Sequence, residues 1–218
     1  MKISQNTIAL LKNMSTINQS IVISPGSLIS TAAGSSIVAV AEVEEDFPQE
    51  FGIYDLPQFL NILSIFTEPT IEFKTGKQVT ISQDRMKVSY LFAEPSILTK
   101  APKGVKELPS VAKFELTQTV LAAILKAKDI ISLPQLVIKG EDGVLSLVAT
   151  NTALNEPNTY SVEIGETDRD FKAFVSFDNL KVIPGTYNVD LSERFLKMSA
   201  VDKNLNYWVA LDVKGNKF

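Results

Sequence analysis

Cysteine and histidine are both absent from this 218-residue chain. Without cysteine there is no disulfide, no thiolate nucleophile and no thiolate metal ligand, which suits a reducing environment. Without histidine the chain lacks the commonest general base and metal ligand near neutral pH. Most hydrolase and metalloenzyme mechanisms are therefore closed, and an enzyme is the least favoured class of function.

Phosphate-binding and membrane-crossing sequences are missing as well. No glycine cluster separates a strand-like from a helix-like segment and no Gly-Lys-Ser/Thr occurs, so ATP hydrolysis is not expected. The first 18 residues lack the continuous apolar stretch of a signal peptide, and no later segment approaches the roughly 20 apolar residues that span a bilayer. We therefore expect a soluble, intracellular protein.

An excess of positive charge is also missing, because 21 basic residues face 25 acidic ones and the net charge is −4. A protein that holds nucleic acid through an all-over basic surface has the opposite balance. Any contact with DNA must therefore be local, or must depend on the geometry of the protein.

Two groups of carboxylates are candidates for acid–base chemistry or for a hard metal ion. The first contains Glu42, Glu44, Glu45 and Asp46, and the second contains Glu141 and Asp142. The alternation at Glu42 and Glu44 is better explained by the solvent face of a strand, and the second group by the tip of a turn. We expect no catalytic residue, no metal site and no cofactor.

The remaining composition is that of an ordinary globular protein, with 45% hydrophobic and 21% charged residues. This length supports one large domain or two domains of about 110 residues. Periodicity fails between Glu94 and Pro109, where prolines, a glycine and three lysines replace it. We therefore predict a domain at residues 1–94, a connector at 95–110 and a second domain at 111–218.

The first domain is predicted to open with a helix, because Ser4 is a good N-cap and apolar residues then recur at helical spacing up to Ile17. Asp55 can cap a second helix, which accepts Pro57 in its first turn and runs to about Phe66. Strand patterns fill the rest, at residues 21–23, 36–43, 71–74, 79–82 and 87–92.

The second domain repeats this order of elements. Thr117 caps a helix that runs to about Asp129, and a short helix starts at Asp178 and stops before Pro184. A turn at residues 140–143 joins the first two strands. Strands are predicted at 136–139, 144–149, 160–164, 171–175, 186–191, 195–201 and 206–213. The fold class is therefore α+β.

Short stretches of sequence also repeat ahead of the helices. Ile3-Ser4-Gln5 matches Leu116-Thr117-Gln118, and residues 51–55 match residues 174–178. Two similar domains explain these matches, and a single large α+β domain with coincidental caps explains them as well.

Basic residues gather in the four predicted helices. They are Lys12, Lys126, Lys128 and Lys181. Lysine is a good helix former that often lies on solvated faces, which accounts for any one of them. Together they suit a molecule that presents helices to DNA and keeps its acidic excess on outer sheets, where it repels DNA from the wrong side.

Short blocks of sequence indicate a family. They are Met1–Ser4, Thr7–Asn13, Ser15–Asn18, Ile53–Leu56, Phe59-Leu60, Ile62–Ser64, Ala93–Ser96, Pro184–Tyr187 and Asn206–Leu211. These blocks follow one another along the whole chain and resemble the sliding clamps of T-even-type bacteriophages.

The resemblance implies a DNA clamp fold, in which each chain has two similar domains with antiparallel sheets outside and helices lining a central hole. Three chains would join head to tail into a ring with twelve lining helices. Such a ring encircles duplex DNA without reading its sequence, tethers the replicative DNA polymerase and takes part in late transcription. A clamp-loader ATPase opens it, in the cytoplasm of the infected host cell.

The resemblance also assigns roles to residues. The four lysines are expected to line the channel around DNA. Polymerase and loader are expected to dock short peptide tails in a hydrophobic pocket near the connector. Its candidate residues are Val40, Leu108, Tyr207, Trp208 and Val209.

Two other functions remain open on the residues alone. A self-associating, β-rich phage structural or interaction module would carry the same lysines merely as solvated side chains. An enzyme acting through paired carboxylates is the third hypothesis, and the missing histidine weighs against it.

Overall fold

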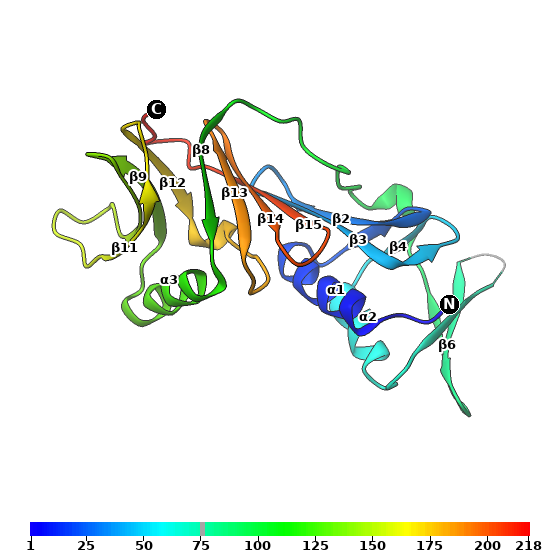
Figure 1. The fold of residues 1–218 in the computed structure, drawn as a ribbon. Helices are drawn as coiled ribbons and strands as arrows, with labels where there is room; N and C mark the ends of the chain where they lie inside the picture. The colour runs from blue at the N-terminus through cyan, green and yellow to red at the C-terminus, as the bar shows by residue number, and fades with distance from the viewer. Residues whose placement is uncertain (75–76) are drawn as a thin grey trace. The chain divides into compact units, whose positions relative to one another are not determined.

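The computed structural model describes residues 1–74 and 77–218 (Figure 1). The chain forms two compact units, each with its own core. Unit 1 contains Met1–Ala33 and Val38–Val105, and unit 2 contains Gly34–Ile37 and Lys106–Phe218. The main division, between residues 105 and 106, falls inside the segment predicted as the connector.

Unit 1 combines two α-helices with short antiparallel strands (Figure 1). Its helices are α1 (Gln5–Ile17) and α2 (Leu56–Leu63). Strand β1 (Ile21–Ile23) pairs with β4 (Phe51–Ile53), β2 (Gly26–Ala33) lies beside β3 (Ile37–Phe47), and β5 (Thr70–Phe73), β6 (Gln78–Gln83) and β7 (Met86–Leu91) form a three-stranded sheet in that order. A short 3₁₀ turn, η1 (Pro95–Ile97), follows.

The predicted caps start both helices of unit 1. The Ser4 hydroxyl accepts a hydrogen bond from the amide of Thr7, and the Asp55 carboxylate accepts one from the amide of Gln58 at 2.8 Å. Helix α2 ends at Leu63 and not at about Phe66 as predicted. The reason is local, because the amide of Phe66 bonds to the carbonyl of Leu63, an i to i−3 bond that tightens the chain into a 3₁₀ turn.

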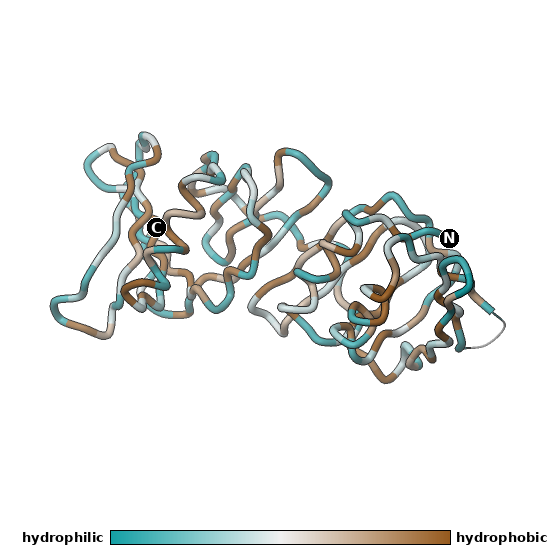
Figure 2. The backbone as a smooth tube through the Cα atoms, turned by 90° about the horizontal axis from the view of Figure 1, so that it is seen from below, coloured by the Kyte–Doolittle hydropathy of each residue, from teal (hydrophilic) through white to brown (hydrophobic). Residues whose placement is uncertain are grey.

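Aromatic side chains fill much of the core of unit 1. Phe51 stacks on Phe92 with ring centroids 4.3 Å apart. Phe73 contacts both of these rings, and Phe59 contacts Phe92. All of them project from separate elements, so the cluster ties the strands of this unit to helix α2. The hydropathy colours in Figure 2 change repeatedly along the chain, as amphipathic elements require. Within residues 1–74 and 77–218, no helix is long and apolar enough to cross a membrane.

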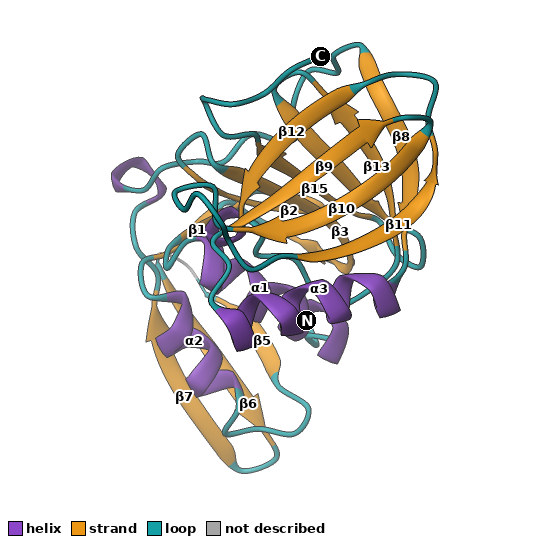
Figure 3. Ribbon diagram, turned by 90° about the vertical axis from the view of Figure 1, so that its left-hand side faces the viewer, coloured by secondary structure: helices purple, strands orange, loops and turns teal. Residues whose placement is uncertain are grey.

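Unit 2 consists of two antiparallel four-stranded arrangements and one long helix (Figure 3). The first has the order β11 (Tyr160–Glu166), β10 (Val144–Thr150), β9 (Gln135–Glu141) and β12 (Phe171–Ser176). The second has the order β15 (Leu205–Ala210), β14 (Phe195–Ala200), β13 (Tyr187–Ser192) and β8 (Ser110–Leu116). Helix α3 (Gln118–Ile131) starts at the predicted cap Thr117 and contacts β10 and β11.

The fourth predicted helix does not form, which corrects the expectation of a short helix from Asp178. Its place holds a single 3₁₀ turn, η2 (Phe177–Asn179), followed by an irregular segment. Pro184 disfavours helical backbone at Ile183. Both backbone groups of Ile183 also bond to tyrosine hydroxyls, its amide to Tyr207 at 3.3 Å and its carbonyl to Tyr187 at 2.5 Å.

Three strands were not predicted: β2, β4 and β8. Strand β2 has the sequence GSLISTAA, in which glycine, serine and alanine have weak strand preference. Strand β4 has only three residues, and strand β8 begins at the end of the segment predicted as the connector. The predicted turn between β9 and β10 is confirmed as a tight hairpin, with left-handed backbone at Asp142 (φ 52°) and Gly143 (φ 82°).

Candidate nucleic-acid interface

The helices are the basic part of an acidic protein. Helices α1, α2 and α3 together carry three lysines and one aspartate, a net charge of +2, whereas the chain carries −4. The remainder of the chain therefore holds the whole acidic excess. A basic helical surface on an acidic protein attracts phosphate locally and leaves the rest of the surface repulsive to DNA.

Three of the four candidate channel lysines lie on helices. Lys12 in α1 and Lys126 in α3 are exposed. Lys128 is half-buried and forms an ion pair with Asp129, with 3.1 Å between Nζ and Oδ1, so part of its charge is neutralised. Lys12 belongs to unit 1, whereas Lys126 and Lys128 share one helix of unit 2.

Lys181 reaches the surface from an irregular segment and not from a helix. It is exposed between the buried residues Leu180 and Val182. Ile183, two residues after Lys181, forms hydrogen bonds to tyrosine hydroxyls through both its amide and its carbonyl. These bonds hold the segment in place without helical hydrogen bonds. Burial raises the pKa of both Tyr187 and Tyr207, whose hydroxyls therefore stay protonated at any physiological pH.

The candidate residues of the partner pocket differ in exposure. Val40 lies in β3 of unit 1 and is buried, and Tyr207 and Val209 have no exposed surface. Leu108 is half-buried, and Trp208 is 9% exposed. Tyr207 packs edge-on against Tyr187 with ring centroids 6.1 Å apart, so its side chain belongs to the core of unit 2.

Among residues 1–74 and 77–218, the carboxylates outline no metal site. Glu42, Glu44 and Asp46 are exposed along β3, which confirms the solvent face predicted for the first two. Glu45, named in the same group of carboxylates, is buried instead. Strand alternation contained the signal, since Glu45 falls in phase with the buried residues Val43 and Phe47.

Glu141 behaves as a surface group at a turn, as predicted. A hydrogen bond from Lys139 and the charges of Lys139 and Lys172 lower the pKa of its carboxyl group. No cluster of three or more potential metal ligands occurs within the part of the chain that the structure describes.

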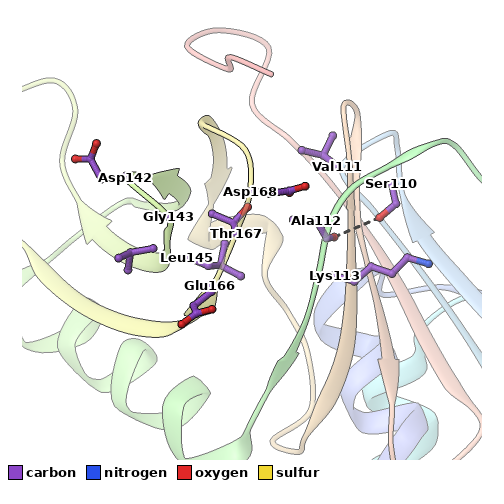
Figure 4. A pocket seen from close by; sticks show the side chains of 11 residues that line it. Ser110, Val111, Ala112, Lys113, Asp142, Gly143, Leu145, Glu166, Thr167 and Asp168 are labelled. Carbon is purple, nitrogen blue, oxygen red and sulfur yellow. Dashed lines mark hydrogen bonds between the residues drawn. The ribbon is translucent and has the colours of Figure 1, made fainter.

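A cavity of about 840 Å³ lies in unit 2, at one end of the two sheets (Figure 4). One wall is the start of β8, from Ser110 to Lys113, and the other is formed by loop residues Asp142 and Thr167 with their neighbours. Carboxylates of Asp142, Glu166 and Asp168 line it. None of these groups is buried, so the cavity is an open polar recess.

A small apolar patch lies at the end of α3, next to the first residue of edge strand β11. We call it the α3 patch. It consists of Ala123, Ala127, Ile130, Ile131 and Tyr160, with Lys126 at its border, and encloses a hollow of about 370 Å³. Ile130 is 70% exposed and Ile131 is 37% exposed. The two exposed isoleucines suit a protein contact, and the sequence reasoning missed this patch.

This arrangement of helices and antiparallel sheets is the fold of DNA clamps. A solved structure described as the C-terminal region of FEN-1 bound to A. fulgidus PCNA has a TM-score of 0.72 to this chain, over 95% of each chain. Its sequence identity is 12%, so this likeness concerns the fold alone. The predicted fold class is confirmed.

Sequence comparison defines the family within that fold. A model of DNA polymerase processivity factors matches residues 2–104. The sliding clamp of Vibrio phage KVP40 is 30% identical over 97% of this chain and 99% of its own length, and the sliding clamp of Enterobacteria phage T4 is 27% identical over 97% of both chains. The chain belongs to the sliding clamps of T4-like phages. Members of this family are processivity factors of DNA polymerase and not enzymes. This confirms the predicted sliding-clamp function and the prediction that an enzyme is the least favoured class.

Proposed function

We propose that three copies of this chain close head to tail into a ring that encircles duplex DNA and tethers the phage replicative polymerase, in the cytoplasm of the infected host cell. The observation that carries the proposal is the basic character of the helices in a chain of net charge −4. A topological link needs only weak, non-specific phosphate contacts, because dissociation requires the ring to open. Lys12, Lys126, Lys128 and Lys181 are the proposed channel residues.

One sheet edge of each unit is proposed for assembly. Strand β7 ends the three-stranded sheet of unit 1, and its side chains Met86 and Leu91 are 49% and 70% exposed. Strand β11 ends a sheet of unit 2 beside the α3 patch. Pairing β7 of one copy with β11 of the next would cover both edges and the exposed isoleucines, and it would join unlike surfaces, as a closed ring requires.

Partners are proposed to attach through short peptides. The structure described as the C-terminal region of FEN-1 bound to PCNA is a clamp of the same fold that holds such a segment. We assign this role here to Val40, Leu108, Tyr207, Trp208 and Val209, of which Leu108 has the most exposed surface, and we propose a clamp-loader ATPase and the polymerase as partners. A role in late transcription would use the same region.

Mass and topology test the ring together. Light scattering is expected to give a species near three times the 23.9 kDa chain mass. After loader treatment, the protein is expected to stay on closed or nicked circular DNA and to leave linear DNA. A multimer indifferent to DNA topology would instead support a self-associating structural module, and a monomer at every concentration would contradict both functions.

The interface has its own test in the α3 patch. Ile130→Glu places a charge in the proposed contact and is expected to weaken assembly at least tenfold, since burying an unpaired charge is costly. Val201→Glu is the matched control, because Val201 is also an exposed apolar residue of unit 2 (55%) but lies in a turn outside the patch. Equal dissociation of the two variants on dilution would exclude the α3 patch from the interface.

A further inference from the structure

A row of four residues crosses the sheet β8-β13-β14-β15 of unit 2. Lys113 lies opposite Asp190, Asp190 opposite Lys197, and Lys197 opposite Trp208. In the adjacent row Val189, Met198 and Tyr207 are buried, so by strand alternation the row of Lys197 projects from the other face. Lys113, Asp190 and Lys197 border a shallow cavity of about 470 Å³ on that face.

The connector is attached to this row through one carboxylate. Glu107 lies in irregular backbone, its side chain is 78% exposed, and it binds Lys197 with 2.6 Å between Oε1 and Nζ. The neighbouring Leu108 is half-buried. Lys197 is only 26% exposed, so a cation that is largely withdrawn from water has this connector carboxylate as its ion-pair partner.

Trp208 leaves a donor unused beside that cation. The residue is only 9% exposed. Its indole N–H is buried and has no hydrogen-bond acceptor among the described residues. Buried donors without an acceptor are rare in native proteins and cost free energy. Directly opposed side chains in a sheet have Cβ atoms about 5 Å apart, so the side chains of Lys197 and Trp208 leave the sheet side by side.

We propose that Lys197 and the indole N–H of Trp208 form a subsite for a carboxylate of a partner peptide, and that Glu107 occupies this subsite until the peptide displaces it. The inference rests on the proposed function, in which partners dock peptide tails near the connector. A carboxylate is the ligand indicated, because the group already seated on Lys197 is a carboxylate and because an ammonium and an N–H are both donors. Glu107 is therefore an internal competitor.

The charges around the subsite agree with an exchange. Lys197 lowers the pKa of the Glu107 carboxyl group through a hydrogen bond and its charge, whereas Asp190 opposes the effect. With Glu107 in place, two lysines face two carboxylates and the row is neutral. When Glu107 leaves, the row carries one positive charge and attracts a replacement anion.

Peptide binding tests the proposal. The probe is a synthetic peptide with the carboxyl-terminal sequence of the phage's own replicative polymerase, measured by calorimetry with the full-length clamp. Glu107→Gln removes the competitor and is expected to tighten binding by about two- to fivefold, the range of an exposed ion pair. Lys197→Gln is expected to weaken binding, and Trp208→Phe is expected to weaken it about tenfold while keeping the aromatic ring.

Two further peptides identify the carboxylate. One ends in a carboxamide, and the other has its acidic side chains replaced by their amides. One of these two peptide changes is expected to weaken binding to the wild-type clamp and to leave binding to Lys197→Gln unchanged. The reason is that the peptide carboxylate and the Lys197 ammonium interact only when both are present. Lys113→Gln is the control, since Lys113 shares the row and pairs with Asp190 at 3.3 Å, and its affinity should stay within about twofold of the wild type.

Failure of this proposal is distinguishable from failure of the clamp function. Retention on circular DNA, measured on the same variants, reports ring closure without the peptide. The subsite would be overturned if Glu107→Gln bound the peptide with wild-type affinity. It would also be overturned if each peptide change weakened binding to the wild type and to Lys197→Gln by the same factor. Absence of any peptide binding would also overturn it, and normal DNA retention would then leave the ring itself standing.

Discussion

The hydroxyl of Thr7 donates a hydrogen bond of 2.5 Å to the carboxylate of Glu45, which joins helix α1 to strand β3. The amide of Ser4 donates to the other carboxylate oxygen, also at 2.5 Å. Glu45 is only 6% exposed, yet it sits at the positive end of a helix and receives two charge-assisted bonds. Glu45, which the sequence groups with three neighbouring acidic residues, thus anchors the first helix of unit 1.

Thr7→Val tests this anchor, because valine keeps the shape of threonine and removes the hydroxyl. The carboxylate would lose one of its two donors, so we expect the free energy of unfolding to fall by about 1.5–3 kcal/mol. Thr16→Val is the control on the same helix, since the Thr16 hydroxyl is exposed and bonds back to the carbonyl of Asn13. Chemical denaturation should show a change within about 0.5 kcal/mol for the control. Similar losses in both variants would rule out a special role for Glu45.

Two glycines opposite the same residue should respond differently to alanine. Gly140 and Gly165 both pair with Leu145, one from β9 and the other from β11. A Cβ at Gly140 would lie 2.7 Å from the ring of Phe171 and overlap the carbonyl oxygen of Arg169, whereas a Cβ at Gly165 would meet open space.

We therefore expect Gly140→Ala to destabilise the protein by about 1–3 kcal/mol through overpacking. Gly165→Ala is expected to be neutral, or stabilising by up to about 1 kcal/mol, because it restricts the unfolded chain. Thermal and denaturant unfolding of the two variants measure the difference. An unaffected Gly140→Ala would show that β9 and the Phe171 ring separate easily.

Charge reversal tests the proposed channel. The variant changes four lysines together to glutamate: Lys12, Lys126, Lys128 and Lys181. Phosphate contacts supply a salt-dependent part of DNA binding, so we expect shorter retention on circular DNA at moderate salt and a weaker dependence of retention on salt.

A matched variant separates position from net charge. It reverses four exposed lysines outside the helices: Lys103, Lys106, Lys203 and Lys214. Both variants change the net charge equally, and the control is expected to keep near-normal retention. Equal losses in the two would show that overall charge matters and that the four proposed channel positions have no special role.

High pH should unfold the protein through its two buried tyrosines. Burial raises the pKa of Tyr187 and of Tyr207 above the ordinary value of 10.0, so both stay protonated in the folded state when the unfolded chain already ionises. Their stabilisation is complete below pH 10 and is lost as the pH rises from 10 towards the folded pKa. The loss is about 1.4 kcal/mol per pH unit for each tyrosine.

Tyr187→Phe isolates that contribution. Its free energy of unfolding is expected to be lower than that of the wild type at pH 8, because the bond to the carbonyl of Ile183 is gone, and to fall less steeply above pH 10. Denaturation measured from pH 8 to pH 11 gives both slopes. Identical slopes would show that Tyr187 ionises freely in the folded protein.

Local chemistry made much of the fold predictable. Ser4, Asp55 and Thr117 start helices where their side chains can accept an amide hydrogen, and Asp142-Gly143 turns the chain because its backbone suits a tight hairpin. These features depend on residues a few positions apart, so the sequence contains them. Strand β2 escaped prediction because its small residues gain strand structure from their neighbours.

The sequence by itself determined the helix starts, the alternation of the strands, the excess of lysine on helices and the kinship with phage clamps. Only the tertiary structure decided that Ile183 would bond to two tyrosines in place of a helix, that Glu45 would be buried against Thr7, and that Glu107 would bind Lys197. Most of these partners are far apart along the chain, and only Tyr187 lies close to its partner, four residues beyond Ile183. Their interaction energies exist only once the sheets have formed, and no local pattern of residues records them.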